Sequence, residues 1–365
     1  MQTKTESRPV RVLLVAPSLD ILGGQAVQAD RLLRLLRQES SLEVDLLPVN
    51  PRLPGPLALL QRVMYLRTLV TFPYYCLLLA LRVPRWEVLH IFSASYLSFV
   101  LAPTPAILAA KLFRRKSILN YRSGEAEDHL ARWRSALLII RLVDEVVVPS
   151  AYLVDVFSKF GVRARPVFNS VPTERYRFRE RRPLRPLFLS NRNFHPMYNV
   201  ANTLRAFALI QRRYPEASLT LAGDGQERRE LEQLAAALGL RNVRFLGQAP
   251  PERMPALYDG ADIYLNSSEI DNMPTSIIEA YAAGTPVVTT NAGGIPCILS
   301  HEETGLMVEC RNPEAMAGSA IRLLENETLA GRIVANARRE CEKYVWSSVR
   351  DQWVQLYLSL ARQPS

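Results

Sequence analysis

Short apolar runs alternate with helix-forming segments along most of this chain. Residues 11–16 (RVLLVA) and 145–148 (EVVV) are two such runs, and each precedes a segment whose apolar residues have helical spacing. A run that is apolar at nearly every position suits a strand buried on both faces, as in parallel sheets. Strands that alternate with helices form parallel sheets with helical crossovers. The order therefore predicts an α/β fold.

The length of the chain and one irregular segment predict two domains. A chain of 365 residues suggests about two domains on the usual size range. Residues 173–186 are rich in Arg and Pro, which is typical of a linker. We therefore expect two Rossmann-like, doubly wound domains that face each other across a cleft, residues 1–170 and residues 171–345.

Positive charge is concentrated in the first half. Residues 1–175 carry 23 Lys and Arg against 14 Asp and Glu, whereas residues 176–365 carry 22 against 21. A basic half favours an anionic partner, such as phospholipid headgroups or a lipid-linked phosphate. We expect no nucleic-acid partner, because no compact Lys/Arg run with interleaved aromatic residues is present.

Residues 51–85 combine Leu, Tyr and Phe with five arginines. Such a helix can lie on an anionic membrane, or it can pack on the core with a solvated basic edge. Charged residues and Pro73 interrupt its apolar tract, so we expect no membrane-spanning helix. The first ten residues have no signal-peptide pattern, and the four cysteines show no paired or zinc-site spacing. We expect a cytoplasmic protein that can associate peripherally with the inner face of the membrane.

The segment from residue 266 to residue 296 contains the strongest candidate site. A polar loop follows a buried strand at 261–265, and a helix from about Pro274 precedes a second strand at 286–290. Loops at the carboxyl ends of parallel strands bind ligands in α/β sheets. The start of the helix, with Thr275 and Ser276 in its first turn, favours an anion such as a diphosphate. Glu279 stands where it can accept hydrogen bonds from ribose hydroxyls.

Two acidic residues in this segment, Asp271 and Glu279, are separated by seven others and are followed by Gly284, the sequence PVV and the pair Gly293-Gly294. This pattern resembles the nucleotide-sugar site of the retaining GT-B glycosyltransferases, the glycosyl transferases group 1 family (family 4 type). The first acid is Asp rather than the commoner Glu, so its side chain is one methylene shorter. The alternative is an ordinary strand–loop–helix with a capped helix start.

The resemblance implies an enzyme that moves a sugar from a UDP- or GDP-linked donor to a glycan or lipid-linked acceptor, with retention of configuration and with no metal ion or other cofactor. It implies that Asp271 holds donor-sugar hydroxyls, with backbone groups of Asn272 and Met273 nearby. Arg192 and the start of the helix at Pro274 would neutralise the leaving diphosphate. The resemblance also implies that the last helix, about 346–365, packs back on the first domain.

The chain departs from the family pattern at two positions. Tyr198 or Asn199 stands where the family has a lysine for the donor diphosphate, and Arg122 stands where many members have a histidine. Arg122 cannot act as a base at neutral pH, but it can bind a phosphate or carboxylate in bidentate fashion. We retain it as a candidate catalytic residue.

The remaining candidates are one histidine and several glycines. His90, near the end of a strand at 87–92, is either a site residue or a satisfied core histidine. Glycine lets backbone come close to a ligand oxygen. Four glycines in loops after predicted strands are donor-site candidates on this ground, although a plain turn explains the first pair equally: Gly23, Gly24, Gly223 and Gly247.

Three other functions remain open. The chain is compatible with a nucleotide-sugar epimerase or hydrolase on the same fold. The replaced lysine and Arg122 also allow a non-catalytic partner that binds nucleotide sugar or membrane and supports another transferase. A membrane-surface scaffold is supported by the basic half alone.

Overall fold

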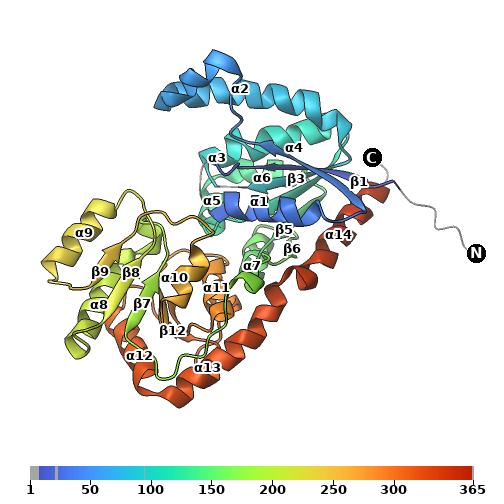
Figure 1. The fold of residues 1–365 in the computed structure, drawn as a ribbon. Coiled ribbons are helices and arrows are strands. Elements are labelled where there is room, and N and C mark those ends of the chain that lie inside the picture. Colours follow the sequence, from blue (N-terminus) through green and yellow to red (C-terminus); the bar gives the residue numbers. More distant parts are fainter. Residues whose placement is uncertain (1–7, 21–23, 94, 364–365) are drawn as a thin grey trace, which may run out of the picture. The chain divides into compact units, whose positions relative to one another are not determined.

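The structure, a computed structural model, describes residues 8–20, 24–93 and 95–363 (Figure 1). It divides into two compact units. Unit 1 contains the residues up to 168 together with those from 349 on, and unit 2 contains residues 169–348. Each unit is built on a six-stranded sheet in which every strand pair is parallel. The predicted α/β class with two parallel sheets is therefore confirmed.

Unit 1 has the strand order β2-β1-β3-β4-β5-β6. Strand β1 (Val10–Ala16), the second in this order, is fully buried from Val12 onward, which explains the uninterrupted apolar sequence from that residue. The elements that follow in this unit are α1 (Gly24–Leu36), β2 (Leu42–Pro48), η1 (Gly55–Arg62), α2 (Met64–Arg82), η2 (Val83–Arg85), β3 (Val88–Ser93), α3 (Leu97–Leu101), α4 (Pro103–Leu112), β4 (Lys116–Tyr121), α5 (Ala126–Arg132), α6 (Arg134–Ile140), β5 (Glu145–Val148), α7 (Ala151–Lys159) and β6 (Arg165–Pro166).

Unit 2 has the strand order β12-β11-β10-β7-β8-β9. Its elements are η3 (Thr173–Arg175), β7 (Leu187–Ser190), η4 (Pro196–Tyr198), α8 (Val200–Arg213), β8 (Ser218–Leu221), α9 (Arg228–Ala237), β9 (Val243–Phe245), α10 (Met254–Asp259), β10 (Ile263–Asn266), α11 (Thr275–Ala283), β11 (Val287–Thr290), η5 (Ile295–Cys297), β12 (Leu306–Val308), α12 (Pro313–Glu325), α13 (Glu327–Glu340) and η6 (Cys341–Tyr344). The chain runs from β7 to β8 and β9 on one side, and from β10 to β11 and β12 on the other.

The last helix, α14 (Trp346–Arg362), contributes Val349 and later residues to unit 1. Its Trp353 and Tyr357 rings pack on His90 of β3, with ring centroids 4.7 and 5.9 Å from that of the imidazole. Near the start of the helix, the Arg350 guanidinium forms an ion pair with the buried Glu39 carboxylate. These contacts make the end of the chain part of the core of unit 1.

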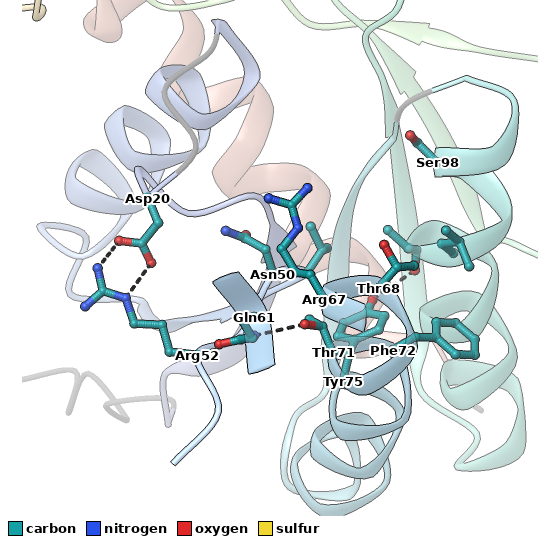
Figure 2. Close-up of a pocket in the computed structure, with 13 residues that line it drawn as sticks. Asp20, Asn50, Arg52, Gln61, Arg67, Thr68, Thr71, Phe72, Tyr75 and Ser98 are labelled. Atoms are coloured by element: carbon teal, nitrogen blue, oxygen red, sulfur yellow. Dashed lines mark hydrogen bonds and ion pairs between the residues drawn. The ribbon is translucent and has the colours of Figure 1, made fainter. Parts of the chain in front are cut away.

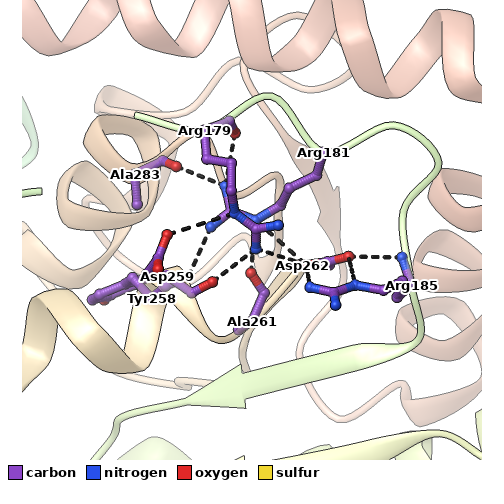
Figure 3. A network of polar contacts seen from close by, with 8 residues as sticks. All are labelled: Arg179, Arg181, Arg185, Tyr258, Asp259, Ala261, Asp262 and Ala283. Carbon is purple, nitrogen blue, oxygen red and sulfur yellow. Dashed lines mark hydrogen bonds and ion pairs between the residues drawn. The ribbon is translucent and has the colours of Figure 1, made fainter. Parts of the chain in front are cut away.

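A buried arginine holds the linker of unit 2 against its sheet (Figure 3). The side chain of Arg181 donates hydrogen bonds to the carbonyls of Ala261 at 2.7 Å, Ala283 at 2.7 Å and Tyr258 at 2.8 Å. The carboxylate of Asp262, at the start of β10, lies 3.5 Å from its Nε. The segment that precedes β7 is thereby fixed to the elements that carry the candidate site.

Of the helices that the structure describes, none combines the length and apolar character that a membrane crossing requires.

Candidate active site

Two loops of unit 2 diverge where the strand order reverses. The loop after β7 leads to one side of the sheet and the loop after β10 leads to the other, which creates the crevice where open α/β sheets bind ligands. Arg192 comes from the first loop and Asp271 from the second. Arg192 Nη2 donates to Asp271 Oδ2 at 2.6 Å, and the two side chains are only 13% and 11% exposed. The structure thus brings together the two residues predicted to face the donor.

The Asp271 carboxylate has two further donors. Ser268 Oγ lies 3.1 Å from its Oδ2, and the backbone N–H of Asn272 donates to its Oδ1 at 3.0 Å. Three groups from three positions therefore fix the orientation of the carboxylate.

Arg192 is held by an aromatic ring as well as by this ion pair. Its guanidinium carbon lies 4.1 Å from the centroid of the Tyr198 ring, which is a cation–π contact. Burial has the largest single effect and lowers the pKa of Arg192. The Asp271 carboxylate and the side chains of Tyr198, Tyr264 and Tyr258 together outweigh burial, so the pKa lies above its usual value. The guanidinium is consequently charged at any physiological pH.

Helix α11 begins beside this pair without a side-chain cap. Pro274 at its N-cap position offers no side-chain acceptor, and the first turn contains no acidic residue. Ser276 Oγ lies 3.5 Å from Nη1 of Arg192, so the first turn and the guanidinium are adjacent. An uncapped helix start next to a cation attracts an anion, because the free N–H groups and the helix dipole add to the positive charge.

Glu279 lies in the second turn of α11 and is 8% exposed. Burial, with a smaller effect of the Glu279 carboxylate, raises the pKa of Tyr258 well above its usual value, so that this phenol stays neutral. Its hydroxyl donates to the backbone carbonyl of Ser276 at 2.8 Å, which supports the first turn from below. Asn272 and Met273, which precede the helix, are also buried.

The glycine pair 293–294 permits a close approach between two loops. A Cβ atom on Gly293 would lie 2.1 Å from the carbonyl oxygen of Asp271, and one on Gly294 would lie 2.0 Å from that of Asn272. Gly293 also has a φ of +51°, in the region that favours glycine. The pair therefore fixes the backbone that carries Asp271.

Gly223 has the same function on the other side of the crevice. A Cβ atom there would lie 2.1 Å from the carbonyl oxygen of Arg192, so glycine is required for the loop after β8 to pack on the loop after β7. Gly247 has a φ of +72°, which explains glycine at that turn. Their predicted contacts with the nucleotide remain predictions.

The structure gives separate functions to the two residues at the position of the family lysine. Tyr198 stacks on Arg192, whereas Asn199 adopts a left-handed conformation and caps α8 by accepting a hydrogen bond from Asn202 N. Asn199 Nδ2 also donates to Glu269 Oε1 at 2.5 Å. The replacement is visible in the sequence but the stacking is not, since a contact between Tyr198 and Arg192 has no fixed sequence spacing.

The other candidates lie in unit 1. His90 has no exposed surface; Asn120 Nδ2 donates to its Nε2 at 2.9 Å, and its Nδ1 lies 2.6 Å from the Tyr357 hydroxyl. These contacts favour the core interpretation of His90. Arg122 follows β4 and lies over the Phe92 ring at 5.1 Å; burial lowers its pKa to about 9. Gly24 opens α1, and Gly23 lies outside the described residues.

Comparison with known proteins identifies the second unit. Residues 173–340 match the family described as "Glycosyl transferases group 1". These residues form a group 1 domain. The match spans nearly all of unit 2, including both loops of the Arg192–Asp271 pair. For residues 173–340, the resemblance to the group 1 family that the acidic pair and glycines indicated is therefore confirmed.

Relatives of the group 1 domain include a D-inositol 3-phosphate glycosyltransferase of Corynebacterium urealyticum, 34% identical over 169 residues, which are 44% of this chain and 40% of that protein. A glycogen synthase of Mycobacterium tuberculosis is 26% identical over 278 residues, 71% of this chain and 66% of that protein. The chain thus spans about two fifths to two thirds of the length of these relatives.

Two solved structures resemble the whole chain. HepE of Anabaena, in complex with UDP and glucose, has a TM-score of 0.75 at 17% identity and covers 96% of this chain and 100% of its own. Sucrose-phosphate synthase of Thermosynechococcus elongatus has a TM-score of 0.79 at 19% identity, with 96% and 99% covered. At these identities the likeness establishes the fold class, which is GT-B, with two Rossmann-like units.

Proposed function

We propose that this protein transfers a sugar from a nucleoside-diphosphate sugar to an acceptor hydroxyl, with retention of configuration at the anomeric carbon. The observation that carries the proposal is the Arg192–Asp271 pair beside the uncapped start of α11. The group 1 domain supports it, as does the HepE structure with UDP and glucose, which favours a uridine donor.

The reaction breaks the bond between the anomeric carbon and the diphosphate oxygen, and the diphosphate leaves with the electron pair. The acceptor oxygen bonds to the same carbon, and its proton passes to the departing phosphate. Arg192 and the first N–H groups of α11 stabilise the negative charge on the diphosphate. In this proposal they make a metal ion or other cofactor unnecessary. Asp271 accepts hydrogen bonds from donor-sugar hydroxyls, and Glu279 accepts them from the ribose.

Calorimetric titration of the full chain with UDP, GDP and ADP, and then with the matching sugars, tests the donor site. We expect selective binding of UDP that Glu279→Ala weakens at least tenfold. Glu230→Ala is the matched control, because Glu230 is exposed on α9 of the same unit. Donor affinity that is unchanged in Glu279→Ala would remove Glu279 from the ribose site.

Turnover tests the role of Arg192. Arg192→Ala should lower kcat far more than donor affinity, since the charge on the diphosphate develops in the transition state. Arg244→Ala, an exposed arginine of unit 2, is the control. Donor binding without transfer to any glycan or lipid-linked acceptor would indicate a non-catalytic partner. Conversion of the donor sugar in the absence of an acceptor would indicate an epimerase or a hydrolase.

We also propose that η1 and α2 lie on an anionic membrane surface. Leu69, Leu77 and Leu81 are 71%, 52% and 58% exposed, and with Pro73 they form a stripe at four-residue spacing. Residues 46–86 contain five arginines and no acidic residue. Asp20 and Asp45, which lie outside this range, pair with Arg52 and Arg82, and the segment still carries more positive than negative charge. An apolar stripe on such a segment suits an anionic bilayer. The cytoplasmic location itself remains a prediction from the sequence.

Sedimentation with phosphatidylglycerol vesicles tests the membrane contact. We expect binding that weakens with added salt, because salt screens exposed charges, and that is lost in Leu77→Glu. Leu238→Glu alters an exposed leucine of unit 2 and serves as the control. Equal binding to neutral phosphatidylcholine vesicles would contradict the electrostatic part of the proposal.

A further inference from the structure

Unit 1 contains a cavity of about 400 Å³ that is built from its own residues (Figure 2). Asp20 lines it from the loop after β1, and Asn50 lines it from the segment after β2. Residues of α2 and α3 form much of the remaining wall. The cavity therefore lies at the carboxyl ends of two parallel strands, the edge of an α/β sheet that usually binds ligands.

The amide side chains that line the cavity are already used within the protein. Asn50 accepts a hydrogen bond from Ser18 N and donates one to Ser18 Oγ, both at 3.0 Å. Gln61 Oε1 accepts from Leu53 N at 3.0 Å, and its Nε2 donates to Pro51 O and Thr71 Oγ1. These amides hold the loops in place and leave little capacity for a ligand.

The carboxylate of Asp20 is also engaged. Both of its oxygens accept hydrogen bonds from the Arg52 guanidinium, and Ser18 Oγ lies 3.2 Å from Oδ2. Asp20 and Arg52 therefore neutralise each other at one side of the cavity, where Figure 2 shows them paired.

Three lining side chains form no hydrogen bond or ion pair with any described residue: Arg67, Thr68 and Ser98. Arg67 is consequently the lining residue, within the described part of the chain, whose charge has no opposite partner. One guanidinium and two hydroxyl groups form a set that suits a phosphate, because Arg donates only and hydroxyls can donate to its oxygens. A neutral glycan also needs acceptors for its own hydroxyls, and the lining carboxylate and amides are occupied.

The rest of the wall is hydrocarbon. Phe72 and Tyr75 of α2 and Leu101 of α3 line the cavity, and the Tyr75 hydroxyl is consumed by a hydrogen bond to Ala102 O at 2.9 Å. Figure 2 shows Phe72 and Tyr75 on the same helix as Arg67. A ligand that fills the cavity therefore contacts one cation and a mainly apolar surface.

We propose that this cavity binds a phosphate ester with an apolar substituent. The binding site does not depend on the proposed transfer reaction. At about 100° per residue, Arg67, Thr71 and Tyr75 are centred roughly 130° around α2 from the Leu69–Leu77–Leu81 stripe, so the cavity residues and the proposed membrane contact occupy different faces of the helix.

Calorimetric titration of the full chain with n-octyl phosphate, inorganic phosphate, glycerol 3-phosphate and 1-octanol tests the proposal. We expect octyl phosphate to bind at least tenfold more tightly than each of the other three, and Arg67→Gln to weaken it at least tenfold. Arg85→Gln, which alters an exposed arginine just after α2, should change its affinity by less than twofold. Equal binding of glycerol 3-phosphate would overturn the apolar part of the proposal, and equal binding of octanol would overturn the phosphate part.

The same titration in the presence of saturating UDP separates this site from the donor site. Octyl phosphate should bind equally well with and without UDP, and equally well to Arg192→Ala. Displacement by UDP would place the probe in the donor site and overturn the proposal. Normal UDP binding without octyl phosphate binding would refute the cavity site while leaving the proposed donor site intact.

Discussion

Replacing Arg181 by Met should destabilise unit 2 by about 3–5 kcal/mol, the range for breaking a buried ionic contact. The substitution removes one donor, seen in Figure 3, from each of the carbonyls of Tyr258, Ala261 and Ala283. The Tyr258 and Ala283 carbonyls keep a backbone donor, the N–H of Ala261 and of Arg179, each at 3.2 Å, so the loss is largest at the Ala261 carbonyl. Each buried acceptor without a partner costs about 1–3 kcal/mol. The Asp262 carboxylate keeps its ion pair with Arg185 at 3.0 Å. Because no carboxylate is left unpaired, we expect the loss of stability to stay below the sum of the costs of all the lost contacts.

Scanning calorimetry and urea unfolding measure the effect. For a unit of this size, about 2–4 °C is lost per kcal/mol, which predicts a fall in Tm of roughly 6–20 °C. Arg177→Met is the matched control, because Arg177 is exposed in the same linker. A loss in Arg181→Met no larger than that in Arg177→Met would refute the reasoning that the four-way contact of Arg181 fixes the linker.

Three further predictions concern the sites. Tyr198→Leu should lower kcat roughly 5–30-fold, the equivalent of a buried cation–π contact of about 1–2 kcal/mol. Tyr198→Phe keeps the ring and should keep the rate. Equal rates in the two variants would contradict the stacking role. Burial lowers the pKa of His90 to about 3, below the value of about 6.5 in an unfolded chain, so the unfolded state binds more protons and the stability of unit 1 should fall as pH drops below about 6.5. The urea midpoint of His90→Phe should fall less steeply with pH, and an identical slope would exclude His90 as the source. Treatment with EDTA should leave UDP affinity and turnover within twofold, whereas a loss that Mg²⁺ or Mn²⁺ restores would contradict metal independence.

The strands could be predicted from the sequence because buried parallel strands have a simple signature. The predicted strand at 145–148 coincides with β5, and the one at 11–16 lies within β1. Helix α2 was harder to predict, because its sequence contains Pro73. The helix continues through Pro73, which lies on the exposed stripe. Proline has no N–H to donate to the carbonyl of Leu69, four residues earlier. Leu69 is 71% exposed, so water can bind its carbonyl instead.

The candidate site was predictable only where residues are close in sequence. Asp271, Asn272 and Glu279 lie in a single strand–loop–helix unit, so their spacing specifies their geometry. Contacts between distant segments have no such spacing. Arg181 reaches Ala283 from 102 positions away, and Tyr198 acts through its ring on Arg192 rather than through a charge. Neither contact can be inferred from composition or periodicity.

The glycines show why a motif can identify a site without revealing what each of its residues does. The sequence suggested that glycine admits backbone to the ligand. In the structure, Gly293 packs on the carbonyl of Asp271 and Gly223 packs on that of Arg192, each where a Cβ atom would come within 2.1 Å. The two glycines thus allow neighbouring backbone to pack closely on the loops after β7 and β10. These two loops carry Arg192 and Asp271, whose ion pair has a length of 2.6 Å. The glycine pattern and the ion pair are therefore one device: close backbone packing sets the positions of the cation and the carboxylate before any donor binds.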